Sequence, residues 1–263
     1  MEAYDIIIQG GQSNSEGSGI GPVEKAYEPS ENILYLDVDK TVEVLPEGGL
    51  KITYADKPFQ LHIAEERLWQ DNQILGDFSL TFSKKYIENG LLDTGRKILI
   101  VRAAIGGTGF QTTHWGLQDR LFLKMLEMTD YALSLNPNNR VAGFLWHQGE
   151  NDAVEGNTPQ NYRKQLLDML SFVREKYGNM PFVAGDFVNE WKMLNIDICN
   201  PIVNVIREIV EEVDSAAFVE TADLLSNNQT IGNGDNIHFS RQSLYVLGER
   251  YFNEFQRIKR EER

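Results

Sequence analysis

Hydrophobic residues gather in five short runs along the chain, and polar, glycine-rich stretches follow most of them. The runs cover residues 4–9, 97–103, 141–148, 181–187 and 216–220. Each is partly β-branched and nearly continuous in apolar residues, which is typical of strands that are covered on both faces of a parallel sheet. The pattern therefore predicts five buried, parallel strands.

Amphipathic segments lie between and after these runs and predict helices. They cover residues 79–90, 117–135, 158–178, 199–213 and 240–258. Thr158 followed by Pro159 is a helix start signal, and Ser240 is the expected N-cap of the last helix. Strands that alternate with helices favour an α/β doubly wound sheet, and right-handed crossovers place helices on both of its faces.

Residues 20–78 interrupt this alternation. They contain short β-like pieces separated by prolines, and we interpret them as a β-rich insertion packed on the same domain. The chain shows no linker, internal repeat or low-complexity stretch. We therefore expect a single domain over residues 1–263, with the insertion at about 20–78.

Composition and charge narrow the class of protein. The chain is 41% hydrophobic and has a formal net charge of -14. The first value argues against wholesale disorder, and the second against partners such as nucleic acid or an anionic membrane. Cys199 is the only cysteine, so neither an internal disulfide nor a cysteine-rich zinc site is available, and a buried apolar role is expected.

The sequence also gives an expectation for location. No signal peptide and no apolar run of membrane-spanning length is visible in the sequence. A cytoplasmic protein is the expectation, with a secreted protein whose signal peptide has been removed as the alternative.

Polar clusters follow four of the strand regions. They are Gly11–Asn14, Ile105–Thr108, His147–Asp152 and Gly234–His238, the last of them just before the final helix. In an open α/β sheet, ligands bind beyond the carboxyl ends of the strands. If the strands are parallel, all four clusters lie at that edge, which predicts a functional site there.

Ser13 is the candidate nucleophile in the first cluster. Ser13 and Glu16 also fit a capping box, in which both side chains satisfy backbone donors at a helix start. The two interpretations are compatible, because backbone N–H groups surround a residue in the first turn of a helix and can stabilise an oxyanion.

A serine nucleophile needs a base, and the chain has four histidines. His62 lies in the insertion, His114 follows the second strand and could touch a substrate, and His147 could be a core residue. His238 follows Asp235 by three residues, a spacing that lets the carboxylate orient the imidazole ring. The alternative for this pair is an ordinary polar loop.

Oxyanion donors are expected from two other clusters. Gly106 or Gly107 lets a backbone N–H approach a substrate oxygen, although a tight turn explains these glycines as well. Gln148 offers a side-chain amide, with a buried amide that joins loops as the alternative.

Two rival sites fit less well. The glycine-rich stretch after the first strand lacks the Gly-Lys-Ser/Thr ending of a P-loop, and its glycines do not form a dinucleotide fingerprint. His147, Glu150 and Asp152 offer metal-ligating atoms but lack the helical spacing of a zincin motif.

The four clusters together resemble the SGNH/GDSL hydrolase superfamily. The blocks are "GQSN", "IGGT", "WHQGENDA" and "DNIH", which span residues 10–240 in the superfamily's order. Gln148 stands where the superfamily usually has asparagine. This feature is similar to the branch of sialate O-acetylesterases and carbohydrate esterase family 6 acetylxylan esterases, as is "GDFSLTFS" at 76–83.

The resemblance implies a flavodoxin-like three-layer α/β/α domain with a five-stranded parallel sheet of order 2-1-3-4-5. It also implies Ser13 as nucleophile, His238 as base and Asp235 as the orienting acid. The oxyanion hole would consist of the Ser13 and Gly106 backbone amides and the Gln148 side chain.

The resemblance also implies residues that support the site, and the sequence differs from the family's pattern at one place. Glu150 and Asp152 would brace loops without transferring protons. Ser15 and Glu16 stand where relatives often carry an apolar residue, which affects the rim beside the nucleophile and hence the choice of substrate.

The sequence therefore predicts a serine esterase that removes O-acetyl groups from a small carbohydrate substrate such as acetylxylan or an acetylated sialic acid. The acetyl group would pass through Ser13, and no metal or organic cofactor is required. The candidate substrate-binding residues are Gln12, Asn14, Gly107, His114 and Trp115, with the insertion around Trp69 as a further wall. The alternatives are a catalytically silent carbohydrate-binding protein on the same fold and a short-chain esterase for a non-sugar ester.

Overall fold

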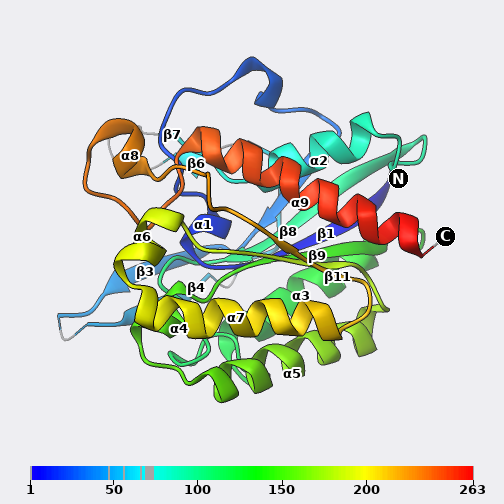
Figure 1. Ribbon diagram of the computed structural model, residues 1–263. Helices are drawn as coiled ribbons and strands as arrows, with labels where there is room; N and C mark the ends of the chain where they lie inside the picture. The colour runs from blue at the N-terminus through cyan, green and yellow to red at the C-terminus, as the bar shows by residue number, and fades with distance from the viewer. Residues whose placement is uncertain (1, 47, 56, 66, 69–73, 263) are drawn as a thin grey trace.

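The computed structural model describes residues 2–46, 48–55, 57–65, 67–68 and 74–262. Its strands fall into one large sheet and two small ones (Figure 1). The bounds are β1 Ala3–Gly11, β2 Ile33–Asp37, β3 Lys40–Val44, β4 Leu50–Tyr54, β5 Leu61–Ile63, β6 Arg67–Leu68, β7 Ile74–Leu75, β8 Arg96–Ala104, β9 Arg140–His147, β10 Phe182–Gly185 and β11 Ala216–Val219.

The large sheet has the order β11-β10-β9-β1-β8-β2-β5. All neighbouring pairs are parallel except β2 and β5. The five apolar runs form β1 and β8 to β11, and residues 6–8 and 98–101 in the two central strands are fully buried.

The predicted number of strands was too low: the large sheet has seven strands and not five. The two additional strands come from the insertion. β2 lies parallel to β8, and β5 returns antiparallel along β2 as an edge strand with an exposed side. β2 can extend the sheet because Ile33, Tyr35 and Leu36 are apolar or aromatic and are buried there.

Helices cover both faces of the large sheet (Figure 1). The helices α2 and α9 pack together on one face, and α3, α5 and α7 lie on the other. The bounds are α1 Ser13–Glu16, α2 Ser79–Glu88, α3 Arg120–Ser134, α4 Glu150–Val154, α5 Pro159–Tyr177, α6 Asn189–Leu194, α7 Ile196–Glu212, α8 Asn227–Ile231 and α9 Arg241–Glu261, with a 3₁₀ turn at Lys25–Tyr27.

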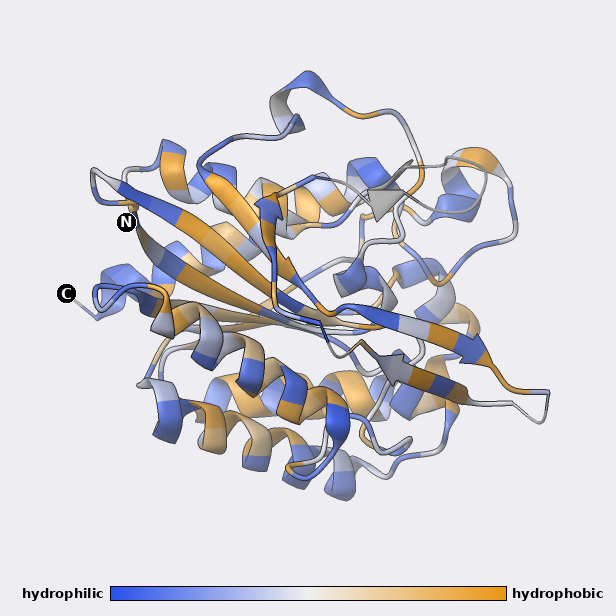
Figure 2. Ribbon diagram, turned by 180° about the vertical axis from the view of Figure 1, so that it is seen from behind, coloured by the Kyte–Doolittle hydropathy of each residue, from blue (hydrophilic) through white to orange (hydrophobic). Residues whose placement is uncertain are grey.

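The predicted helix starts are confirmed at two places. Thr158 accepts a hydrogen bond from Asn161 N, and Ser240 accepts one from Ser243 N. Figure 2 shows that the central strands are hydrophobic and that the helices carry alternating apolar and polar stripes. This amphipathic pattern lets each helix bury one side on the sheet.

The insertion also forms a hairpin near the carboxyl edge of the sheet. Strands β3 and β4 pair antiparallel, and Figures 1 and 2 show the hairpin projecting away from the large sheet. Strands β6 and β7 form the second small sheet. Cys199 is buried, as expected. Within the described residues, no helix is both long and apolar enough to cross a bilayer.

Candidate active site

A cavity of about 530 Å³ lies at the carboxyl edge of the large sheet. It collects residues that follow β1, β8 and β9 together with residues of the loop before α9. Its lining consists of Gln12, Ser13, Glu16, Ser18, Ile20, Leu50, Gly106, Gly107, Glu150, Asn151, Val154, Asp235, Ile237 and His238. Residues of all four predicted polar clusters therefore meet in one place.

A glycine turn places Ser13 at this edge. Gly11 ends β1 with a φ of 139°, and a Cβ there would lie 2.1 Å from the backbone oxygen of His147. Gln12 N donates to the same oxygen at 3.1 Å. The close approach of β1 to β9 thus requires glycine, and the next turn of chain brings half-buried Ser13 to the cavity wall.

The capping box that was the alternative interpretation of Ser13 and Glu16 does not form at the start of α1. The N-cap of α1 is Gln12, and it makes no side-chain capping bond. The Glu16 carboxylate instead accepts from Lys40 Nζ at 2.7 Å and from Gly106 N at 2.8 Å. The Ser13 side chain is therefore not used to cap the helix.

Asp235 and His238 form the expected pair. His238 Nδ1 lies 2.9 Å from Asp235 Oδ1 and 3.0 Å from Oδ2. Asn227 Nδ2 donates to the same carboxylate at 2.8 Å. Burial by itself would raise the pKa of Asp235, but the hydrogen bonds from His238 and Asn227 lower it below its usual value. Asp235 is thus an anion that fixes the ring and leaves Nε2 to act on other groups.

Asn14 joins the loop of His238 to the turn that contains Ser13. Asn14 Nδ2 donates to Ile237 O at 3.1 Å, and Asn14 Oδ1 accepts from Phe239 N at 3.1 Å. Asn14 Nδ2 also donates to Glu150 Oε1 at 3.0 Å. The backbone is therefore held on both sides of His238 by the residue next to Ser13.

This arrangement corrects the prediction that Asn14 binds substrate. Its side chain is fully buried, and it does not line the cavity. All its polar atoms are used to join segments of the protein, so none faces a substrate.

Ser13 and His238 line the same cavity from opposite segments of the chain. No hydrogen bond joins the Ser13 hydroxyl to the His238 ring in the described part of the structure. Such bonds are often long or absent without substrate and tighten when it binds. The structure therefore brings Ser13 and His238 to one cavity without a hydrogen bond between their side chains in the described residues.

Gly106 lies beside Ser13. A Cβ on Gly106 would be 3.3 Å from the Ser13 Cβ, so a larger residue would press on Ser13. Its N–H donates to Glu16, which occupies the direction that the prediction reserved for an oxyanion. Gly107 also lines the cavity, and it adopts a φ of 73° that favours glycine.

Gln148 is not placed as the sequence predicted. It is fully buried, it does not line the cavity, and its Nε2 donates to Asp152 Oδ2 at 2.6 Å and to Thr108 O at 3.2 Å. Its amide therefore joins loops behind the cavity, which is the alternative considered from the sequence, and in this position it cannot donate to an oxyanion.

Asp152 lies where the sequence placed it, between loops. Its carboxylate accepts from Phe110 N at 3.0 Å, Gln111 N at 2.8 Å and Asn157 Nδ2 at 2.8 Å. These bonds fix the loop after β8 against α4. Gln12, which lines the cavity, contributes in a similar way, because its Oε1 accepts from Asn151 N at 3.1 Å.

A second cavity of about 430 Å³ adjoins the first and shares Leu50, Gly107 and Asn151 with it. It is lined by Val44, Leu45, Gly49, Leu50, Gly107, Gln111, Thr112, Thr113, His114, Asn151 and Glu155. His114 therefore lies on a surface that a substrate can reach. Burial lowers the pKa of His114, so the ring is neutral at neutral pH.

The prediction that Trp115 binds substrate is wrong. The ring is fully buried, packs edge-on against Trp146 at 4.8 Å between centroids and donates to Thr108 Oγ1 at 3.2 Å. It is part of the core under the cavity and has no face for a sugar. Trp69, the other proposed wall residue, lies outside the described residues.

His147 and Glu150 form a buried polar pair beneath the site. His147 Nδ1 is 3.0 Å from the Tyr251 hydroxyl, and His147 Nε2 is 3.9 Å from Glu150 Oε1. Burial lowers the pKa of His147 to about 3, and burial raises the pKa of Glu150 to about 6. Among the described residues, no group of three histidine, cysteine or acidic side chains is placed to hold a metal ion.

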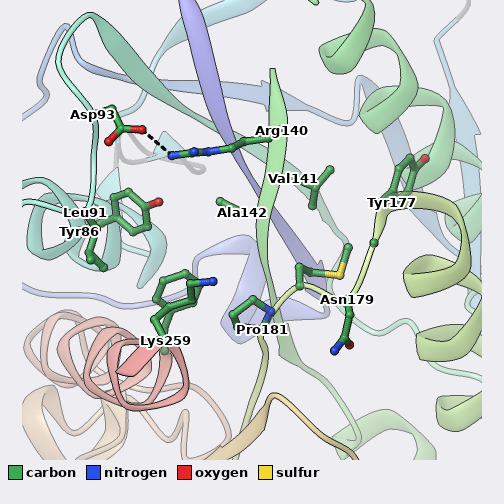
Figure 3. A pocket seen from close by; sticks show the side chains of 13 residues that line it. Tyr86, Leu91, Asp93, Arg140, Val141, Ala142, Tyr177, Asn179, Pro181 and Lys259 are labelled. Atoms are coloured by element: carbon green, nitrogen blue, oxygen red, sulfur yellow. Dashed lines mark hydrogen bonds and ion pairs between the residues drawn. The ribbon is translucent and has the colours of Figure 1, made fainter. Parts of the chain in front are cut away.

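A further hollow of about 470 Å³ lies at the opposite edge of the sheet, at the amino ends of β9 and β10 (Figure 3). Arg140 is ion-paired there with Asp93 at 3.0 Å. Among the described residues that line it there is no serine, cysteine or histidine, so it does not repeat the pairing of serine and histidine found in the first cavity.

Sequence reasoning missed the part of the site that comes from the insertion. Leu50 of β4 lines the cavity, and Lys40 of β3 bonds Glu16 in its wall, but no motif marks these two strands. Glu16 was considered as a local cap and as a residue of the rim beside Ser13. Its bonds to Lys40 and Gly106 could not be predicted, because these partners lie in distant segments.

The fold and the site together define a class of protein. A parallel-dominated sheet between helices, with a serine after the first strand and an Asp-His pair before the last helix, is the arrangement of a carboxylic ester hydrolase of the SGNH type. A family model described as "Carbohydrate esterase, sialic acid-specific acetylesterase" matches residues 3–257. The chain belongs to this carbohydrate esterase family.

Solved structures show the same fold at low sequence identity. NanS is 18% identical with a TM-score of 0.74, and the match covers 99% of this chain and 98% of that one. A protein from Arabidopsis thaliana is 15% identical with a TM-score of 0.68, covering 96% and 97%.

A family two carbohydrate esterase from Clostridium thermocellum, solved with cellohexaose, is 15% identical with a TM-score of 0.50, covering 97% of this chain and 64% of that one. No curated protein sequence matches the chain.

Proposed function

We propose that this carbohydrate esterase removes O-acetyl groups from a sugar through an acetyl-enzyme formed on Ser13. The observation that carries the proposal is the cavity that contains Ser13, Gly106, Asp235 and His238. The family match supports an ester of a carbohydrate as the substrate.

In the proposed first step, Ser13 Oγ attacks the acetyl carbonyl carbon while His238 takes the hydroxyl proton. The proton goes to Nε2, because Nδ1 faces Asp235. Asp235 stabilises the imidazolium that forms. His238 then gives the proton to the departing sugar oxygen, and water repeats the sequence on the acetyl-enzyme to release acetate and free Ser13.

The developing oxyanion needs hydrogen-bond donors. We propose the backbone N–H groups of Ser13 and Gly106, two residues that line the cavity and lie next to each other. Because Gly106 N donates to Glu16 in this structure, the substrate oxygen displaces that carboxylate when it binds. Gln148 is left out of this set, since its amide faces Asp152 and Thr108.

Substrate contacts are proposed along the two adjoining cavities. Gln12 and Gly107 line the wall near Ser13, and His114 lines the second cavity. The acetyl group would lie at Ser13 and the sugar would extend past Asn151 into the second cavity. Acetylated xylan and other sugar acetates are the candidates for the assay.

The test is hydrolysis of p-nitrophenyl acetate by the wild-type protein, Ser13→Ala and Ser18→Ala. Ser18 lines the same cavity, but its hydroxyl donates to Ser13 O at 2.9 Å, so it serves as the matched control. Loss of the nucleophile is expected to lower kcat at least about 1000-fold, whereas the control keeps kcat within about tenfold. Equal rates for wild type and Ser13→Ala would remove the mechanism.

The same assay separates the alternatives. A silent sugar-binding protein would show no acetate release from any acetyl ester. An esterase for non-sugar esters would hydrolyse p-nitrophenyl acetate but not sugar acetates. Release of acetate from acetylated xylan or a simple sugar acetate is the result that the proposal predicts.

A further inference from the structure

The charges around the cavity bear on which acetylated sugars it accepts. Three acidic side chains, Glu16, Glu150 and Asp235, line the first cavity, and Glu155 lines the second. Among the described residues that line the two cavities there is no lysine and no arginine.

The lysine that approaches the first cavity is already paired. Lys40 reaches Glu16 from the hairpin, with 2.7 Å between Nζ and Oε1, and only 17% of its side chain is exposed. The Lys40 charge is therefore used within the protein and is not placed to bind a carboxylate of the substrate.

We infer that this site acts on uncharged O-acetylated sugars and discriminates against sugars that carry a carboxylate, such as sialic acids. The inference rests on the proposed function and specifies its substrate class. A carboxylate that enters a partly enclosed site loses hydration, and it is retained only where arginine, lysine or several N–H donors replace the water. The described lining supplies acidic side chains instead.

The second cavity has the groups that a neutral sugar requires. Gln111, Thr112, Thr113, His114 and Asn151 are polar side chains without formal charge at neutral pH, and they line one wall. They can donate to and accept from hydroxyl groups. The negative charge of the whole chain, -14, adds to the repulsion of an anionic substrate as it approaches.

The experiment compares two substrates that differ only in charge. Acetate release is measured for an O-acetylated N-acetylneuraminic acid as the free acid and as its methyl ester, with a monoacetylated neutral hexose as reference. We expect kcat/KM for the free acid to be at least about tenfold below that for the methyl ester, because the acid is unpaired in the site. Higher ionic strength should narrow the difference.

A pair of variants tests the cause. Val154 lines the first cavity and is 58% exposed, so it tolerates a longer side chain. Val154→Lys should raise kcat/KM for the free acid about threefold or more, with little change for the methyl ester. Val154→Gln has similar length without the charge and should leave the ratio of the two substrates unchanged.

The outcomes separate this inference from the proposed function. Equal kcat/KM for free acid and methyl ester, a preference for the free acid, or activity on p-nitrophenyl acetate with none on the neutral sugar overturns the inference. Absence of acetate release from every ester, p-nitrophenyl acetate included, overturns the proposed function instead.

Discussion

At the scale of single residues, Asn14 links the two halves of the site. It follows the proposed nucleophile directly, and its amide holds the backbone at Ile237 and Phe239, on both sides of His238. Its side chain lies outside the cavity lining. We therefore propose that Asn14 is a positioning residue, which acts on catalysis through the place of His238.

Asn14→Ala is therefore expected to lower kcat about 10- to 100-fold, because small misplacements of a base have effects of that size. KM should change little. Asn157→Ala is the matched control, since Asn157 is also buried and bonds Asp152 and Gln165, away from the His238 loop. A fall in thermal stability with full kcat in Asn14→Ala would show that Asn14 has only a structural role.

Glu150 gives a prediction about pH. Burial raises its pKa from 4.5 to about 6, so the folded protein keeps a proton that the unfolded chain loses between these values. The contribution to stability is complete below pH 4.5 and is lost as the pH rises through about 6. Glu150→Gln keeps an acceptor for Asn14 but cannot ionise.

The free energy of unfolding should therefore shift in favour of Glu150→Gln by about 2 kcal/mol between pH 4 and pH 8. Urea titrations of both proteins at the two pH values measure the shift. If the difference in the free energy of unfolding between wild type and Glu150→Gln is the same at both pH values, Glu150 does not have the raised pKa that its burial predicts.

At the scale of elements, the turn from β1 into α1 determines the position of Ser13, the proposed nucleophile. It depends on Gly11, where a Cβ would collide with the backbone of β9. Gly11→Ala should cost more than about 3 kcal/mol in the free energy of unfolding, because neither backbone segment can move without breaking the sheet. Gly95→Ala is the control.

Gly95 also has a positive φ, 82°, but no atom lies within 4 Å of its hypothetical Cβ. Gly95→Ala should therefore lower the free energy of unfolding by only about 1 kcal/mol, which is the cost of the strained backbone conformation alone. Chemical denaturation measures both. Similar costs for the two variants would mean that the close approach of β1 and β9 does not constrain the turn.

Most elements could be predicted from the sequence, because apolar runs and amphipathic periods are local signals. The contribution of β2 and β5 to the sheet could not, since nothing in residues 33–37 shows which strand they join. The same limit applies within the site. Glu16 has a local pattern for capping, yet its bonds run to Lys40 and Gly106.

Burial explains why two residues predicted to act in the site, Trp115 and Gln148, do not face the cavity. Trp115 follows a glycine-rich loop and reads as an exposed aromatic residue, but it packs on Trp146 in the core. Gln148 has the chemistry of an oxyanion donor, but the nearby Asp152 takes its N–H group. Residue type gives chemistry, whereas the direction of a side chain depends on neighbours that are distant in sequence.

At the scale of the whole molecule, the two edges of the sheet differ in their polar residues. The candidate site lies at the carboxyl edge, and the strands are joined at the amino edge by Asp5, a buried carboxylate in β1. Asp5 accepts from Arg96 in β8 at 2.7 Å, from Arg140 in β9 at 2.7 Å and from the Tyr86 hydroxyl at 2.8 Å. It joins the three central strands.

Asp5→Ala should lower the free energy of unfolding by about 3 kcal/mol, because it leaves buried donors without their anion. The folded fraction should keep its kcat, since Asp5 is at the opposite edge from Ser13. Asp93→Ala removes an exposed partner of Arg140 and should cost less than about 1 kcal/mol. Equal costs in urea unfolding would show that the buried network contributes no more than the surface pair.

The central claim is that Ser13 carries the acetyl group during turnover. Acid quenching of the protein during hydrolysis of p-nitrophenyl acetate, followed by mass spectrometry of its peptides, tests this directly. We predict the added mass of one acetyl group on the peptide that contains Ser13, and none on Ser13→Ala. Turnover with the acetyl group on another residue, or undiminished turnover by Ser13→Ala, would contradict the account.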